Sequence, residues 1–279
     1  MKKNKKLVEK TVLNTFQEEI PSIYFSDKNK SEYEKFKDNA EYVYRELFNF
    51  PKEMFKDKKL LDFGGGTGEQ TVYLTNWGAE ITHVEMNNMA IAIAKKVFKK
   101  HGSNINKHRF INTSIFDFDI NKKFDIVHSR GVFSHTYNKE KAFNKLASFL
   151  KPGGYLIFGD PNKIGGFQNM LQRFIVYSLG KSRDHMEEIC ETLFHDDITR
   201  SVKSRAVRTR RSIIFDRWII EQQDDPSIEE VLTLFQKNNL RFYSSHPKFI
   251  FPYLSNSVYS RNPFDIRLFK KYSILSEAL

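Results

Sequence analysis

The chain has 279 residues, of which 40% are hydrophobic and 28% are charged, with 13 glycines and 8 prolines. This composition excludes collagen-like, low-complexity and disordered classes, and the length allows one large domain or two small ones. Lysine and arginine outnumber aspartate and glutamate by 45 to 34, and the net charge of +11 favours contact with an anionic partner. Nucleic acid, a membrane surface and an acidic small molecule all fit that charge.

The cysteine content indicates a reducing compartment. Cys190 is the single cysteine, which excludes an internal disulfide and a thiolate metal cluster. The histidines lack the spacing of metal ligands, so we expect no metal site. The basic start is not followed by an apolar segment, and no apolar run approaches about 18 residues. We therefore expect a cytoplasmic protein without a membrane span.

The first half of the chain alternates between two hydrophobic patterns. Apolar residues among charges from Ser31 to Phe50 predict a packing helix, and we assign residues 1–58 to an N-terminal helical cap. Strands are predicted at residues 60–63, 80–85, 109–112, 124–128 and 155–159, with amphipathic helices between several of them. Parallel neighbours need such crossover connections, so the pattern predicts a parallel sheet covered by helices on both faces.

The alternation stops after Asp160. Residues 161–225 show helical pieces, which we interpret as an insertion, or lid. Ser227 and Glu230 then form a capping box that begins another helix, and strand candidates follow at residues 240–244 and 248–251. The core is therefore predicted at residues 59–160 and 226–252, with a C-terminal tail at 253–279 packed on it. The predicted fold class is α/β: a doubly wound, mostly parallel, seven-stranded Rossmann-like sheet.

A glycine-rich turn follows the first predicted strand. Gly64, Gly66 and Gly68 remove the side chains that would block a ligand from the backbone and the next helix. A dinucleotide fingerprint would place its third glycine at position 69, which is Glu69, and no Gly-Lys-Ser/Thr follows for a nucleotide hydrolase. Glu85 ends the second strand, near the offset at which a carboxylate accepts both ribose hydroxyls.

Four segments carry a family resemblance: LLDFGGGTG at 60–68, ITHVE at 81–85, FDIV at 124–127 and LKPGG at 150–154. In this order and spacing they resemble the class I S-adenosylmethionine-dependent methyltransferases, over residues 59–160 with a weaker return at 226–252. The segment at 129–136 is similar to a loop of bacterial small-molecule members related to the quinone-biosynthesis enzymes. Ser134 stands where those members usually carry a second histidine.

The resemblance implies that S-adenosylmethionine is the cofactor. Asp62 would support the turn and the ammonium group, Glu85 would hold the ribose, and Met86 would lie beside the adenine. Ser114 and Asp117 remain alternatives for the partner of the adenine amino group. The implied cofactor-binding set is Asp62, Gly64, Gly65, Gly66, Gly68, Glu85, Met86, Ser114, Ile115, Phe116, Asp117, Ser129, Arg130 and Gly131.

Methyl transfer requires mainly that the nucleophile is oriented and water excluded, although a hydroxyl or carboxyl acceptor also benefits from a base. His135, on the loop after the fourth strand, is the candidate base; the alternative is that it only holds the loop by a hydrogen bond. Tyr137 is a second catalytic candidate, with a structural role as its alternative. His128 alternates with apolar residues and is interpreted as a satisfied core histidine.

The insertion carries a run of cations without an intervening acid: Arg200, Lys203, Arg205, Arg208, Arg210 and Arg211. A solvated helix face, a nucleic-acid track and an anchor for an acidic acceptor all fit this run, with Arg205, Arg208 and Arg210 as the anchor residues. The Asn/Asp-Pro-Pro-aromatic motif of nucleic-acid amino-methyltransferases does not follow the fourth strand. We therefore predict methylation of a small, acidic molecule; the alternatives are an RNA methyltransferase and a non-catalytic binding protein.

Overall fold

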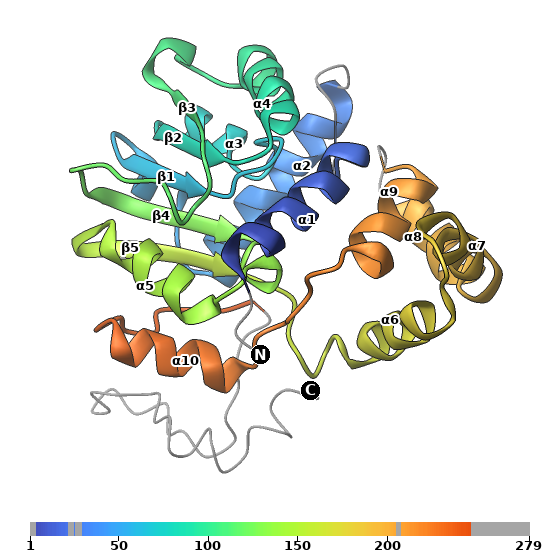
Figure 1. Cartoon of the computed structure of the whole chain (residues 1–279). Helices are drawn as coiled ribbons and strands as arrows, with labels where there is room; N and C mark the ends of the chain where they lie inside the picture. Colours follow the sequence, from blue (N-terminus) through green and yellow to red (C-terminus); the bar gives the residue numbers. More distant parts are fainter. Residues whose placement is uncertain (1–3, 22–24, 26–29, 205–207, 247–279) are drawn as a thin grey trace.

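The computed structural model describes residues 4–21, 25, 30–204 and 208–246. Five parallel strands form one sheet in the order β3-β2-β1-β4-β5 (Figure 1). The strands are β1 (Lys59–Phe63), β2 (Glu80–Glu85), β3 (Arg109–Asn112), β4 (Phe124–Arg130) and β5 (Leu150–Gly159). The order reverses between β1 and β4, which places the crevice for a ligand outside their carboxyl ends.

Helices cover both faces of this sheet, as the alternating pattern predicts. One face packs against α2 (Lys30–Tyr42), α3 (Val72–Asn76) and α4 (Asn88–His101). The other packs against α5 (Lys139–Ser148) and α10 (Ile228–Lys237). Neighbours in a strand point to opposite faces, so Leu60 of β1 joins the first hydrophobic cluster and Leu61 joins the second. The short helices of the core are η1 (Val43–Leu47), η2 (Lys52–Phe55), η3 (Ile105–Lys107) and η4 (Phe133–His135).

The prediction of seven strands is wrong for the part of the chain that the structure describes. The capping box of Ser227 and Glu230 is present at the start of α10, but residues 240–246 follow this helix without forming a strand. Tyr243 of this segment makes its contacts through its side chain: it packs on Tyr155 of β5, and its hydroxyl donates to the carbonyl of Asn49 at 2.7 Å. The other strand candidate, 248–251, lies outside the described residues.

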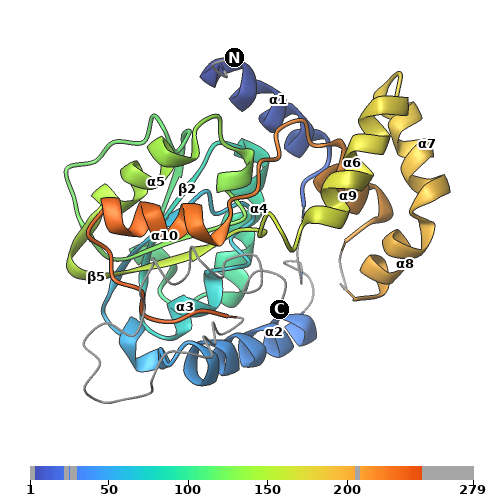
Figure 2. The same cartoon turned by 90° about the horizontal axis from the view of Figure 1, so that it is seen from below.

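The insertion folds around a hydrophobic cluster of its own. Trp218 is fully buried there, donates its indole N–H to Gln172 at 3.0 Å and stacks on Phe194. We call these helices the lid; they lie beyond the carboxyl ends of β4 and β5 (Figures 1 and 2). The lid comprises α6 (Phe167–Leu179), α7 (Arg183–Leu193), α8 (His195–Ser204), α9 (Arg210–Ile214) and η5 (Phe215–Ile219).

Helix α1 (Lys5–Glu18) lies between the lid and the carboxyl ends of the strands (Figure 1). Its Phe16 carbonyl accepts a hydrogen bond from Asn87, just after β2, and its Thr15 hydroxyl donates to Glu221, after η5. The N-terminal segment thus covers the edge of the sheet at which a ligand is expected. Among the described residues, none of the helices combines the length and apolarity needed to cross a membrane.

Candidate functional site

The turn after β1 requires glycine for two different reasons. Gly64 and Gly68 have φ values of 78° and 74°, and a Cβ atom on them would lie 2.6 Å from Val132 and 2.7 Å from Phe98. Gly66 has a φ of 55°, but a Cβ atom there would meet no described atom within 4 Å. The first two glycines therefore permit close packing, whereas Gly66 turns an open face of the backbone toward space that a ligand can enter.

Two side chains of β2 hold the peptide groups of Gly66. The Gly66 N–H donates to Glu85 Oε2 at 2.9 Å, and the Gly66 carbonyl oxygen lies 3.1 Å from His83 Nε2. Residues two apart in a strand project from the same face, which is why both reach one turn. Glu85 Oε1 accepts the Asn87 N–H at 2.8 Å. Burial raises the pKa of Glu85, although the hydrogen bonds from Asn87 and Gly66 act in the opposite direction.

Asp62 lies beneath the turn, in register with a histidine on each neighbouring strand. Its Oδ2 lies 3.0 Å from His83 Nδ1, and its Oδ1 lies 2.9 Å from His128 Nδ1. Burial alone would raise the pKa of Asp62, but the hydrogen bonds of His128 and His83 hold it well below its usual range. Gly65 rests on this network, since a Cβ atom there would lie 2.3 Å from Asp62 Oδ2.

His83 contacts an acceptor with each ring nitrogen, namely the Asp62 carboxylate and the Gly66 carbonyl. Neither acceptor supplies a proton, so both nitrogens donate and the ring is an imidazolium. Burial lowers the pKa of His83, but the hydrogen bond and the charge of Asp62 outweigh it and raise the pKa. A cationic side chain therefore joins Asp62 to the glycine turn. His128 differs from its prediction, because its buried Nε2 has no hydrogen-bond partner in the described chain.

Helix α1 covers the turn after β3. Ser114 donates its hydroxyl to Glu9, and Asp117 forms an ion pair with Lys5. Both alternatives for the adenine partner therefore contact α1. The other residues predicted for this end of the cofactor, Met86, Ile115 and Phe116, are half-buried.

Three residues at and after the end of β4 differ in exposure: Ser129 is held in place by a hydrogen bond, whereas Arg130 and Gly131 are accessible. Ser129 is buried and donates its hydroxyl to the Phe63 carbonyl at 2.9 Å. Arg130 is exposed, and its Nη1 donates to Gln70 Oε1 at 2.8 Å. Gly131 has a φ of 68°, and a Cβ atom on it would meet no described atom within 4 Å. Arg130 and Gly131 therefore face accessible space, as Gly66 does.

His135, on η4, has one ring nitrogen occupied and one free. Its Nδ1 lies 2.8 Å from the carbonyl oxygen of Gln222. A carbonyl only accepts, so Nδ1 carries the proton of the neutral ring and Nε2 carries the lone pair. Nε2 has no hydrogen-bond partner among the described residues, and Phe16 of α1 packs edge-on against the ring at 5.3 Å between centroids. The side chain can therefore accept a proton from a ligand.

Asp160 fixes the backbone of η4. Its Oδ2 accepts the Phe133 N–H and its Oδ1 accepts the Ser134 hydroxyl, both at 2.8 Å. Burial raises the pKa of Asp160. Tyr137, the second catalytic candidate, packs its ring on Phe116 with the centroids 4.5 Å apart. Asp160 thus supports the loop that carries His135, and Tyr137 lies at the rim of a separate cavity.

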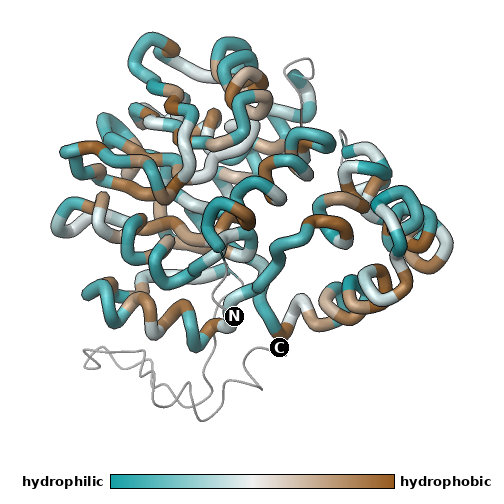
Figure 3. Tube along the Cα trace, viewed as in Figure 1, coloured by the Kyte–Doolittle hydropathy of each residue, from teal (hydrophilic) through white to brown (hydrophobic). Residues whose placement is uncertain are grey.

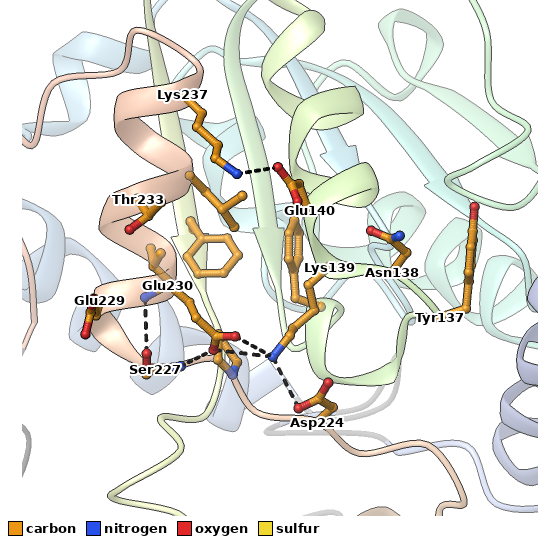
Figure 4. Close-up of a pocket in the computed structure, with 15 residues that line it drawn as sticks. Tyr137, Asn138, Lys139, Glu140, Asp224, Ser227, Glu229, Glu230, Thr233 and Lys237 are labelled. Atoms are coloured by element: carbon orange, nitrogen blue, oxygen red, sulfur yellow. Dashed lines mark hydrogen bonds and ion pairs between the residues drawn. The ribbon is translucent and has the colours of Figure 1, made fainter. Parts of the chain in front are cut away.

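That cavity, of about 730 Å³, lies between α5 and α10 (Figure 4). Lys139 Nζ lies 3.2 Å from Asp224 and 3.4 Å from Glu230, and Lys237 pairs with Glu140 at 2.6 Å. Both lysines that line it are thus paired with acids. Neither the glycine turn nor His135 contributes to its wall, so the cavity is distinct from the site at the carboxyl ends.

The lid arginines have acidic partners from outside their own run. Arg208 is 7% exposed at its side chain and pairs with Asp216 at 2.6 Å. Arg210 Nε donates to Glu191 of α7 at 3.0 Å. Arg205 lies outside the described residues. Arg208 and Arg210 thus each have an acidic partner within the chain, although the buried Nε of Arg208 has no hydrogen-bond partner among the described residues.

Metal-binding and thiol chemistry find little support in the residues that the structure describes. No group of three or more histidine, cysteine, aspartate or glutamate side chains there is arranged to hold a metal ion. Cys190 is buried in the lid, and burial raises the pKa of its thiol to about 12.

Two parts of the site were missed by the sequence analysis. His83 stands two positions before Glu85, and this spacing alone places both side chains on one face of β2. Helix α1 begins after Asn4, whose side chain accepts the N–H groups of Lys6 and Leu7, a recognisable N-cap. The cap signals a helix but carries no information on where that helix docks.

Comparisons with known proteins agree with this geometry. A family model described as a methyltransferase domain matches residues 36–195. Ubiquinone biosynthesis O-methyltransferase of Coxiella burnetii is 31% identical over 108 residues, 39% of this chain and 45% of that protein. Malonyl-[acyl-carrier protein] O-methyltransferase 2 of Ilyobacter polytropus is 32% identical over 99 residues, 36% of this chain and 38% of that protein.

Among solved structures, PKMT2 from Rickettsia typhi matches with a TM-score of 0.54 at 17% identity, covering 78% of this chain and 43% of that one. This likeness supports the α/β fold. The chain spans less than half the length of each of the two curated relatives and of PKMT2.

Proposed function

The chain belongs to the class I S-adenosylmethionine-dependent methyltransferases, and we propose that it transfers a methyl group to an oxygen atom of a small molecule. The free Nε2 of His135 carries this proposal, because a hydroxyl acceptor must lose a proton and this nitrogen can take it. The names of the two curated relatives, both O-methyltransferases, agree with oxygen as the acceptor atom.

The residues at the carboxyl ends of the strands fit S-adenosylmethionine. Gly66 and Gly131 present open backbone faces, and each Glu85 carboxylate oxygen accepts one N–H and keeps a lone pair for a ribose hydroxyl. The sulfonium of the bound cofactor supplies an activated methyl group. Arg130 has no acidic partner among the described residues, and its planar guanidinium suits the carboxylate of the cofactor.

The chain's own contribution to the reaction is positioning and proton transfer. Asp160 holds η4 in place, and the Gln222 carbonyl keeps the Nδ1 proton of His135, so that Nε2 stays available as a base. When Nε2 takes the proton of the acceptor hydroxyl, Gln222 continues to accept from Nδ1 and orients the imidazolium. Phe16 and the rest of α1 exclude water from this side of the site.

The pairing of the lid arginines bears on the acceptor. Arg208 and Arg210 are neutralised by Asp216 and Glu191, so a small-molecule acceptor does not depend on their charge. Because these two arginines are paired with acids, they also offer less positive charge to a nucleic acid bound along the lid. We therefore base the proposal on oxygen chemistry at His135.

Labelled S-adenosylmethionine tests the proposal. The full chain is incubated with ¹³C-methyl S-adenosylmethionine and a fractionated metabolite extract, and the product is examined by ¹³C NMR for an O-methyl signal. His135→Gln should lower the labelling rate by about 10²- to 10⁴-fold and leave cofactor affinity in calorimetry unchanged. A nitrogen- or carbon-bound methyl group, labelled RNA in place of a metabolite, or an unchanged rate in His135→Gln would contradict it.

Glu85→Ala tests the cofactor site separately. Because Glu85 both offers carboxylate oxygens to the ribose and holds Gly66, we expect at least a tenfold loss of S-adenosylmethionine affinity, about 1.4 kcal/mol or more. Glu80→Ala, at the other end of β2, is the matched control and should keep the affinity of the unmodified chain. Equal affinities of the two variants would refute the role of Glu85.

A further inference from the structure

Helix α6 of the lid presents its apolar face to the outside. Gln172 and Val176 point into the lid core, whereas Phe167, Leu171 and Phe174 are 53%, 47% and 71% exposed. The spacing i, i+4, i+7 places these three side chains on one face of the helix. Met170, at 47%, adds to this side of the helix, Ile164 in the turn just before the helix is 40% exposed, and hydrophobic residues recur along α6 in Figure 3.

Soluble monomers rarely expose contiguous apolar patches of more than a few hundred Å². We name the surface formed by Ile164, Phe167, Met170, Leu171 and Phe174 the α6 face. The lid core buries the opposite side of α6, so packing within the lid does not explain why the exposed side is apolar. In the part of the chain that the structure describes, the α6 face stays exposed, and an apolar patch of this kind marks an interaction site.

The charges around the α6 face indicate which apolar partner it suits. From residue 161 to residue 183 the chain contains no aspartate or glutamate and four cations, Lys163, Arg173, Lys181 and Arg183. Arg173 donates to the carbonyls of Arg217 and Ile220, and Arg183 pairs with Glu18 of α1 and with Glu221 after η5. Lys163 and Lys181 flank the two ends of α6, are exposed, and form no ion pair with any described residue.

We propose that the α6 face docks on the surface of a bilayer that contains anionic phospholipid. Apolar side chains flanked by lysines match such a surface, where the aromatic and aliphatic groups enter the acyl boundary and the ammonium groups meet lipid phosphates. The docked lid brings the acceptor side of the catalytic core close to the membrane, because α6 begins shortly after β5.

A second copy of the chain is the main competing occupant. A helix of 13 residues is only about 20 Å long, and its single face is smaller than the roughly 800 Å² per partner of a standard stable interface. Two lysines at the ends of each face would also bring like charges together in a symmetric dimer. Both features favour the lipid surface.

Vesicle cosedimentation of the full chain tests the proposal. Vesicles of equimolar phosphatidylglycerol and phosphatidylcholine should bind the protein more tightly than vesicles of phosphatidylcholine alone, and added salt should weaken the binding. The double variant F167S/F174S should lower the partition coefficient by about tenfold or more. Tyr42→Ser, which removes a 56% exposed aromatic ring on α2, is the matched control and should bind like the unmodified chain.

Two double variants with the same change in net charge distinguish the effect of the lysines beside the α6 face from the effect of net charge. K163E/K181E and K95E/K99E change the net charge equally, but the second pair lies on the exposed side of α4. We expect a loss of anionic-vesicle binding of about tenfold in the first and little change in the second. Equal losses in the two, or no cosedimentation of the unmodified chain, would overturn the proposal.

Light scattering distinguishes membrane docking from dimerisation, and calorimetry checks that the variants still bind S-adenosylmethionine. If the unmodified chain is a dimer that F167S/F174S converts to a monomer, and neither binds vesicles, the α6 face belongs to a second copy and the proposal is wrong. The substituted side chains are exposed, so S-adenosylmethionine affinity in calorimetry should be retained in each variant. This control also keeps a failure of lipid binding distinguishable from a failure of the proposed catalytic function.

Discussion

The catalytic core and the lid use their charged residues in different ways. In the core, Asp62 and His83 are buried and Glu85 is half-buried, and all three contact one another or the backbone of a single turn. In the lid, Arg210 and Arg211 remain partly exposed and pair with acids from other helices. These core charges therefore fix the shape of the glycine turn, whereas the pairs of Arg210 and Arg211 hold helices against one another.

The two arrangements differ in what a single change costs. Removing one member of a buried pair leaves the other charge desolvated and unpaired, at a cost of several kcal/mol. Removing one member of an exposed pair leaves a charge that water can solvate, at a cost of about 0–1 kcal/mol. The comparison predicts a steep order of effects from the core to the lid.

The largest effect is expected for Asp62→Asn. The substitution removes the anion between His83 and His128 and leaves the buried imidazolium without its counter-charge. We expect a loss of about 3–5 kcal/mol in the free energy of unfolding, measured by urea denaturation. Asp125→Asn is the matched control, since that carboxyl pairs with Lys151 at the surface and should cost less than about 1 kcal/mol. Similar losses in the two variants would remove the distinction between a buried and an exposed pair on which the comparison depends.

The pH dependence of stability comes next. The folded pKa of His83 is raised above its unfolded value of about 6.5. Its contribution to stability is therefore fully present below that unfolded value and is lost as the pH rises through the folded pKa. We expect the free energy of unfolding and the affinity for S-adenosylmethionine to fall together in this window, because the same ring holds Gly66.

His83→Gln should flatten that part of the profile, measured by denaturation and calorimetry across pH 6 to 9. His108 provides a control of opposite sign: burial lowers its pKa, so its contribution is lost as the pH falls below the unfolded value. His108→Gln should leave the fall in the free energy of unfolding at alkaline pH, which we call the alkaline limb, unchanged. An alkaline limb that survives in His83→Gln would show that another group causes it.

The sequence predicted the core to the extent that its geometry is local. The five strands follow from alternation, and the glycine turn and Glu85 follow from their spacing. The structure forms these strands into one sheet and places the turn and Glu85 together at the carboxyl ends of β1 and β2. The further strand candidates were residues 240–244 and 248–251, and the second lies outside the described residues. Residues 240–246 form no strand, and Tyr243 there makes its contacts through its side chain, so the local pattern alone did not establish a strand.

The lid could be located from the sequence but its charges could not be interpreted. Arg211 is the last cation of a run without an acid, yet its guanidinium pairs with Glu18 and Glu19, more than 190 positions earlier, and with Glu187. Pairing over such separations depends on how α1 docks, and no local pattern encodes that. The same holds for Ser114 and Asp117, which the structure pairs with Glu9 and Lys5.

The smallest effect is expected at the contact between the lid and α1, and it sharpens the comparison. Arg211→Gln removes the pairs with Glu18 at the end of α1, with Glu19 just after it and with Glu187 of α7, at a side chain that is 41% exposed. We expect the free energy of unfolding to fall by less than about 1 kcal/mol, and the loss to shrink further in high salt. Arg200→Gln is the matched control, because its pair with Asp197 stays within α8.

Since α1 covers the turn after β3, hydrogen exchange of α1 amides should quicken in Arg211→Gln and not in Arg200→Gln, even where stability barely changes. Equal exchange in both would mean that packing around Phe16, and not the arginine pairs, holds α1 over the site.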